Sequence, residues 1–170
     1  MNDWIQTYTG RKFYPLNPNI DDIDIVDIAH SLSMLCRYNG HSTCFYSVAE
    51  HSVYVSQYVK PESALTGLLH DASEAYLGDI SKPIKPFLVG YEKFENRLME
   101  LISEKYNLIY PFPKNIKEID CAILTDEKEI IMAESEYKWS GLKKPIGVDI
   151  ECWLPAKAKD EFLKRYYELL

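Results

Sequence analysis

Residues 47–77 read SVAEHSVYVSQYVKPESALTGLLHDASEAYL, and this stretch decides the fold. It opens with Ser47, followed three residues later by Glu50, which is the spacing of a capping box at the start of a helix. We therefore expect a helix over residues 47–59. The proline that follows suits the first turn of a second helix, which we expect over residues 61–77. Both helices carry histidines and acids among apolar residues, so the same stretch also bears on function.

Apolar residues recur at helical spacing through most of the remaining chain. No stretch shows the alternation of a strand, and the first twenty residues, with one glycine and two prolines, predict an irregular arm. We therefore expect an all-α fold in which residues 1–170 form one domain, a compact helical array with an N-terminal arm over residues 1–20. The helices expected outside the opening stretch cover residues 24–37, 91–106, 115–139 and 155–170.

The composition narrows the range of partners. The length of 170 residues suits one domain, and the formal net charge of -7 argues against a dedicated nucleic-acid binder, which usually carries a basic stripe. No stretch approaches the roughly 20 apolar residues that span a bilayer, and the first residues lack the pattern of a signal peptide. The four cysteines are scattered, which predicts buried free thiols (Cys36, Cys44, Cys121, Cys152). We therefore expect a cytoplasmic protein without a membrane or nucleic-acid partner.

His70-Asp71 is the sharpest chemical feature of the sequence. The pair interrupts an apolar run in GLLHDASE, residues 67–74. Adjacent helical side chains point about 100° apart, and a cation between them would reconcile the two directions. Imidazole nitrogen and carboxylate oxygen are natural ligands of divalent first-row ions. Glu74 shares this helical face, where a carboxylate beside a metal can orient or deprotonate water.

Other candidate ligands sit among apolar residues. His51 does so in VAEHSV, and Asp120 falls on the apolar face of the expected helix 115–139. Burying an unpaired charge at such a position costs free energy, and a bound cation would offset that cost. Asp126 is a rival for the last ligand, because it points roughly 120° away on the same helix. Taken singly, each of these residues, like His30 and His41, also fits a structural role.

The longer motifs are more specific. YSVAEHS at residues 46–52 and HDASEAYLGD at residues 70–79 resemble the HD-domain metal-dependent phosphohydrolases. They are most similar to the small-nucleotidase branch, which includes bacterial 5′-deoxynucleotidases and phage enzymes that strip triphosphate from dATP. The similarity runs from about residue 27 to residue 131. The segments TGRKF at residues 9–13 and DIAH at residues 27–30 resemble phage-encoded members in particular.

The resemblance implies an HD-domain helical array and a role for each matching residue. Glu74 would position the attacking water, and Asp79 would assist catalysis or contact the 3′-hydroxyl. Tyr38 stands where the family often has a tryptophan, which leaves base recognition open. The implied metal ligands are His51, His70, Asp71 and Asp120. The implied phosphate contacts are Arg37, Lys85 and Lys117.

The expected activity is metal-dependent hydrolysis of the 5′-phosphoester of a deoxynucleotide. The phage-like motifs favour a deoxynucleoside triphosphate such as dATP, for which Arg11, Lys12 and Lys82 are spare cations. A deoxynucleoside monophosphate is the alternative, and a cyclic-dinucleotide or oligonucleotide phosphodiesterase and a non-catalytic nucleotide sensor are more distant ones. Two histidines and two aspartates suit Co, Mn, Zn, Ni or Fe, with Mg as a further option. The resemblance also implies a homo-oligomer, either a dimer or a larger ring.

Overall fold

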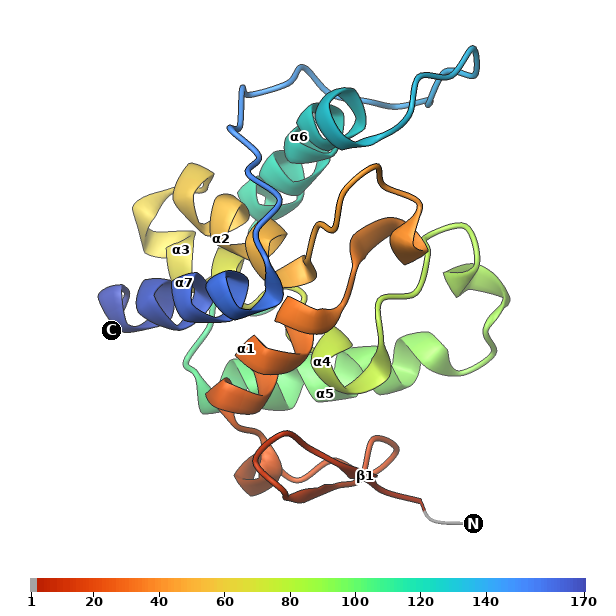
Figure 1. Ribbon diagram of the computed structural model, residues 1–170. Coiled ribbons are helices and arrows are strands. Elements are labelled where there is room, and N and C mark those ends of the chain that lie inside the picture. The colour runs from red at the N-terminus through yellow and green to blue at the C-terminus, as the bar shows by residue number, and fades with distance from the viewer. Residues whose placement is uncertain (1–2) are drawn as a thin grey trace.

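Helices account for most of the regular structure in the computed structural model, which describes residues 3–170. Figure 1 shows the helices packed together, with the N-terminal arm lying below them. The predicted all-α class is confirmed. The α-helices of the described residues are α1 (Ile25–Met34), α2 (Val48–Tyr58), α3 (Ala64–Leu68), α4 (Glu74–Leu77), α5 (Tyr91–Lys105), α6 (Lys114–Ile131) and α7 (Pro155–Glu168).

Helix α2 forms the centre of the bundle. It packs against α1, α3, α6 and α7, and every residue from Val48 to Ser56 is buried. Its cap is the one predicted, since Ser47 Oγ accepts the backbone N–H of Glu50 at 3.1 Å. The carboxylate of Glu50 does not close a capping box, however. It accepts the backbone N–H groups of Cys152 and Trp153 at 2.9 and 2.6 Å, and so ties the segment before α7 to the core.

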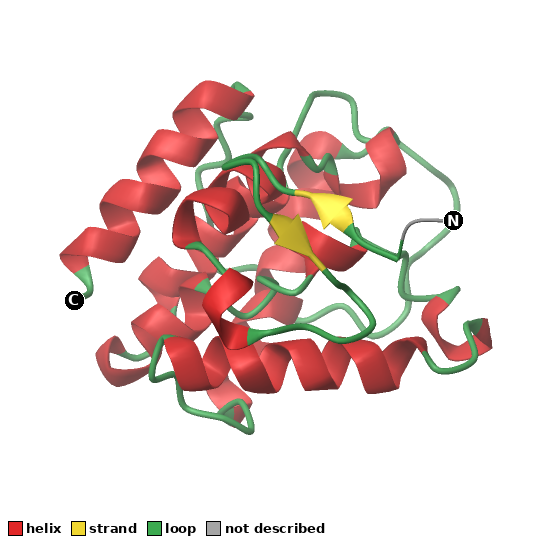
Figure 2. Ribbon diagram, turned by 90° about the horizontal axis from the view of Figure 1, so that it is seen from below, coloured by secondary structure: helices red, strands yellow, loops and turns green. Residues whose placement is uncertain are grey.

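The N-terminal arm is more regular than predicted. It holds an antiparallel pair of two-residue strands, β1 (Ile5–Gln6) and β2 (Lys12–Phe13), which lies on the near face of the helices in Figure 2. The ring of Phe13 is fully buried and stacks on Tyr76 with 4.0 Å between ring centres. This contact anchors the arm against α4. Local sequence patterns do not predict a contact between residues so far apart in the chain.

The prediction of one continuous helix over residues 61–77 is wrong. The chain forms a short 3₁₀ helix, η3 (Pro61–Ser63), followed by α3, and it leaves the helix at Leu69. Residues 69–73 make a turn before α4 begins. His70 and Asp71 lie in this turn, so both side chains can face one centre without the angular offset of a continuous helix.

Helix α6 is shorter than the predicted helix over residues 115–139. It ends at Ile131, whose carbonyl accepts both the backbone N–H and the hydroxyl of Thr43, at 2.7 and 2.9 Å. These two bonds satisfy a carbonyl at the helix end, after which the chain turns extended at Met132. No helix within residues 3–170 is both long enough and apolar enough to cross a bilayer.

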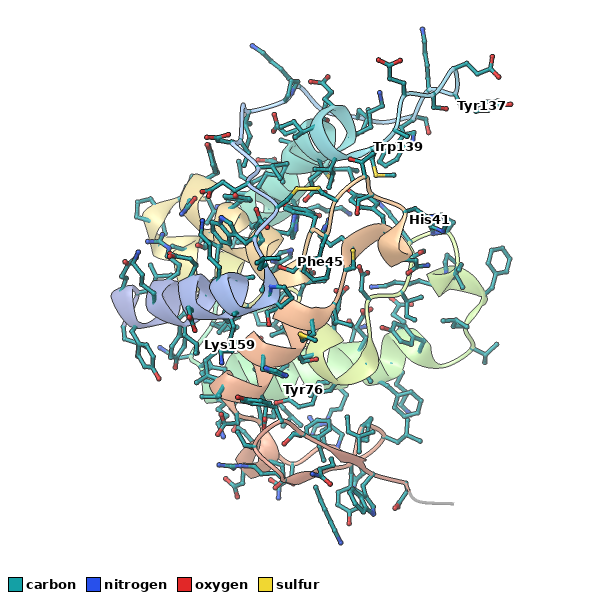
Figure 3. The ribbon with its side chains drawn as sticks, viewed as in Figure 1. His41, Phe45, Tyr76, Tyr137, Trp139 and Lys159 are labelled. Atoms are coloured by element: carbon teal, nitrogen blue, oxygen red, sulfur yellow. A yellow bond between two sulfur atoms is a disulfide. The ribbon has the colours of Figure 1, made fainter. Side chains whose placement is uncertain are left out.

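Two of the cysteines are paired, which corrects the prediction of four free thiols. Cys44 and Cys152 form a disulfide with a Cα–Cα distance of 6.4 Å, although 108 residues separate them. The bond is drawn in yellow in Figure 3. Cys36 and Cys121 are free and half-buried. The disulfide joins the segment before α2 to the segment before α7.

Candidate metal centre

Three side chains from separate elements converge beside α2. His51 comes from α2, His70 from the turn after α3, and Asp120 from α6. One ligand atom from each lies within 4.8 Å of the others, and His51 Nε2 is 3.3 Å from Asp120 Oδ1. Ligand atoms about 2.0–2.2 Å from a shared ion lie at separations of this order. The structure therefore brings together three of the four predicted ligands around one point.

The fourth predicted ligand, Asp71, borders the same point. Its Oδ2 lies 3.1 Å from His70 Nε2 and 3.9 Å from His51 Nε2. Burial acts to raise the pKa of Asp71, but the neighbouring His70, His51 and Arg37 outweigh burial and hold that pKa well below its usual range. Asp71 is therefore an anion that faces both ring nitrogens.

Hydrogen bonds to the far ring nitrogens orient both imidazoles. His70 Nδ1 donates to the carbonyl of Gly67 at 2.8 Å, and His51 Nδ1 donates to Glu127 Oε1 at 2.7 Å. Both Nε2 atoms are thus directed to the centre, where each is buried without a hydrogen-bond partner. A divalent cation would satisfy both, so the donor set fits the metal that the sequence implies.

A proton competes for the same position on His51. Burial and Arg37 act to lower the pKa of His51, but Glu127 and Asp120 outweigh them and raise it to about 9. Metal binding needs the neutral ring, so a cation would displace this proton.

Glu127 is a site residue that the sequence analysis missed. It is fully buried on α6, seven residues after Asp120, which places the two on one face of the helix. Its Oε2 accepts from Arg37 Nη2 at 3.2 Å and from the hydroxyl of Tyr38. Although burial acts to raise the pKa of Glu127, Arg37 and His51 hold it well below its usual range. A carboxylate bonded to a ligand histidine fixes the tautomer of the ring and strengthens it as a ligand.

Arg37, which the resemblance implies as a phosphate contact, pairs with carboxylates beside the metal centre and is not among the residues that line the cavity adjoining that centre. It begins the short 3₁₀ helix η2 (Arg37–Gly40), its side chain is mostly buried, and its Nη1 is 3.7 Å from Asp71 Oδ2. The guanidinium therefore links Glu127 to the metal centre. Tyr38 packs on Trp139 with 5.9 Å between ring centres, and Figure 3 shows Trp139 on the segment after α6.

The two predicted catalytic acids lie close to the charged groups of the centre. Glu74 starts α4, and burial together with Asp71 and Asp79 raises its pKa to about 10. Its buried Oε2 has no hydrogen-bond partner. Burial also raises the pKa of Asp79, which is close enough to Arg37, Asp71 and Lys85 to feel their charges. Because Glu74, Asp79 and Asp71 are close together and at least partly buried, binding of a cation beside them would be favourable.

A cavity of about 510 Å³ opens onto these groups, which is within the usual range for small-molecule sites. Lys85, from the 3₁₀ helix η4 (Lys85–Phe87), lines it and reaches Glu95 at 2.8 Å and Glu74 at 3.8 Å. Lys117 lines it as well, from the first turns of α6. The cavity lining includes four of the site residues, His70, Asp71, Glu74 and Asp120.

Asp126, the rival ligand, faces elsewhere. Its two oxygens accept the backbone N–H groups of Ile146 and Gly147 at 3.1 and 2.9 Å. It holds the segment after α6 against the helix and is outside the metal cluster. Of the spare histidines, His30 stacks on Tyr8 at 3.7 Å between ring centres, and His41 is exposed.

Two curated relatives match almost the whole chain. The uncharacterized protein YfdR of Escherichia coli K12 is 37% identical over 169 residues, which cover 98% of this chain and 95% of that protein. The uncharacterized protein RCAP_rcc00048 of Rhodobacter capsulatus is 33% identical over 187 residues, with 98% and 95% covered. No family model matches the chain. The chain therefore belongs to the family of YfdR.

Proposed function

We propose that the protein is a metal-dependent phosphohydrolase of the HD type that cleaves the 5′-phosphoester of deoxynucleotides. One observation carries the proposal: the Nε2 atoms of His51 and His70 are buried, unpartnered and directed at two aspartates. A structural histidine normally has a partner for each buried nitrogen. Glu74, which lines the adjoining cavity and has one buried oxygen without a hydrogen-bond partner, gives the centre the acid that hydrolysis needs.

When bound, a divalent ion supplies Lewis acidity toward phosphate oxygen and toward water. The chain's own residues perform the remaining steps. Glu74, in the ionised form that the positive charge of a cation at the centre would favour, can take a proton from the attacking water at Oε2. Lys85 and Lys117 offset charge on the phosphate oxygens from the cavity wall. Arg37 pairs with Asp71 and Glu127 and so holds these two carboxylates in place.

The charges around the cavity favour a monophosphate. Lys85 is already paired with Glu95, and the two further lysines of the lining, Lys114 and Lys117, are exposed. With Lys85 largely neutralised by Glu95, the positive charge that the lining adds to that of a bound divalent ion suits a single phosphate group. A triphosphate carries more charge and needs more cations.

The arm cations expected for a triphosphate are engaged elsewhere. Arg11 Nη2 is 3.1 Å from Asp24, and Lys12 Nζ lies 4.9 Å from the ring centre of Trp4. Neither residue lines the cavity. We therefore propose a deoxynucleoside 5′-monophosphate as the substrate. A deoxynucleoside triphosphate such as dATP is the second candidate, favoured by the phage-like motifs at residues 9–13 and 27–30.

A substrate panel tests this proposal. The four deoxynucleoside monophosphates and four triphosphates are incubated with the protein in Co, Mn, Zn, Ni, Fe or Mg, and the phosphate products are separated. We expect inorganic phosphate from the monophosphates. Inorganic triphosphate from dATP would establish the second candidate, and no turnover of either class in any metal would contradict the proposed activity. The cytoplasmic location and the homo-oligomeric state stay predictions.

A further inference from the structure

Part of the cavity lining is apolar and aromatic. The segment that joins α5 to α6 contributes Tyr110 and Phe112, and α5 contributes Met99. The two rings meet edge to face, with 5.3 Å between their centres and 90° between their planes. In such a pair the ring that presents its edge keeps both of its faces out of that contact. Pro111 and Pro113 restrict the backbone that carries the rings.

One cavity thus joins two kinds of chemistry. Its lining includes His70, Asp71 and Asp120 of the metal centre, three lysines, and the aromatic pair. A ligand held by its phosphate at the metal centre therefore shares a cavity with the two rings. The group that suits the rings is flat, with faces that stack on a ring and an edge that hydrogen-bonds. Asn96, an exposed residue of α5 that also lines the cavity, carries both a donor and an acceptor for such an edge.

Tyr38, the base contact that the sequence left open, is engaged elsewhere. Its hydroxyl donates to Glu127, and its ring packs on Trp139. Both contacts hold it within the group of residues that orients His51. Tyr38 is also absent from the cavity lining. A base platform must therefore come from another element.

We propose that Tyr110 and Phe112 receive the nucleobase and that Asn96 contacts its edge. The inference rests on the proposed function, because it assumes a nucleotide phosphate at the metal centre. It identifies the segment between α5 and α6 as the determinant of base preference. Stacking of a base on an aromatic side chain is sequence-tolerant, so the aromatic pair supplies affinity and Asn96 supplies discrimination.

The test compares a nucleotide with its base-free counterpart. Tyr110→Ala and Phe112→Ala are assayed with deoxynucleoside monophosphates and with 2-deoxyribose 5-phosphate. We expect KM for the nucleotides to rise roughly tenfold or more, with kinetic constants for the base-free ester unchanged. Tyr110→Phe, which keeps the ring, should restore the wild-type KM. Phe87→Ala is the matched control, because Phe87 is an aromatic residue that is 82% exposed outside the cavity lining.

Binding measurements separate this inference from the proposed activity. Calorimetry with dAMP and with inorganic phosphate follows binding in wild type, Tyr110→Ala and the exposed-site variant Asn96→Ala. Weaker dAMP binding in the variants, with unchanged phosphate binding, supports the base site even if no substrate is turned over. Unchanged dAMP binding and unchanged nucleotide KM in folded variants would overturn the base site and leave the hydrolytic activity standing.

Discussion

Glu127 Oε1 lies 2.7 Å from His51 Nδ1 inside the core, so a buried carboxylate sets the orientation of a candidate metal ligand. The same carboxylate is paired with Arg37, which in turn approaches Asp71. Glu127 therefore connects two of the predicted ligands through buried contacts. It is fully buried and does not line the cavity, so we expect it to act as a positioning residue.

Removing the charge of Glu127 should weaken metal binding. We expect Glu127→Gln to lower metal affinity about 10- to 100-fold, because the amide is a weaker partner for the imidazole. Competition with a coloured chelator measures the change. Glu129→Gln is the control, since Glu129 is exposed on the same helix. Equal affinity in wild type and Glu127→Gln would show that Glu127 has a purely structural role.

A change at Glu74 should lower turnover without affecting metal binding. Glu74→Gln keeps the shape of the side chain but removes the oxygen that takes a proton from water. We expect metal content to stay near the wild-type value and kcat to fall about 10²- to 10⁴-fold. Glu104→Gln, an exposed change on α5, should leave both quantities unchanged. A kcat within twofold of wild type in Glu74→Gln would assign the base role to another group.

Asp120 and Asp126 should behave differently although they share a helix. Asp120 belongs to the cluster with His51 and His70, whereas Asp126 accepts two backbone N–H groups. We expect Asp120→Asn to lose bound metal and keep its fold. Asp126→Asn should lower the thermal midpoint, because a buried acceptor for two N–H groups is weakened, and should keep its metal. The opposite pattern, with metal lost in Asp126→Asn, would assign the ligand to Asp126.

Thiol counting tests the bond between Cys44 and Cys152. In denaturant without reductant we expect two reactive thiols, Cys36 and Cys121, and four after reduction. Cys44→Ser should lower the free energy of unfolding under oxidising conditions, because the disulfide closes a loop of about a hundred residues in the unfolded chain. Four reactive thiols before reduction would contradict the bond.

Local signals in the sequence were enough to predict most of the helices. Ser47 caps α2 as its spacing indicated, and the helical periodicity located α5 and α7 to within a few residues. The predicted helix boundaries are wrong where contacts between residues far apart in the sequence determine where a helix ends. The end of α6 depends on Thr43, which lies 88 residues from Ile131, and helical periodicity carries no information about such a contact.

The candidate site was predictable to the extent that its residues stand in recognisable motifs. His51 and His70-Asp71 are in such motifs, and the structure brings them together with Asp120 and Arg37. Glu127 was missed because an acid late in a polar helix is typical of a solvent-facing position. Its spacing of two helical turns from Asp120 is the signal that was available.

Metal content measured alongside phosphate release tests the central claim most directly. Wild type and His70→Ala are purified in parallel, loaded with Mn or Co, freed of excess ion and analysed by elemental mass spectrometry, with dNMP hydrolysis assayed on the same samples. The account predicts a stoichiometric ion and phosphate release in wild type, and loss of both in a folded His70→Ala protein. Equal metal content and equal phosphate release in the two proteins would contradict it.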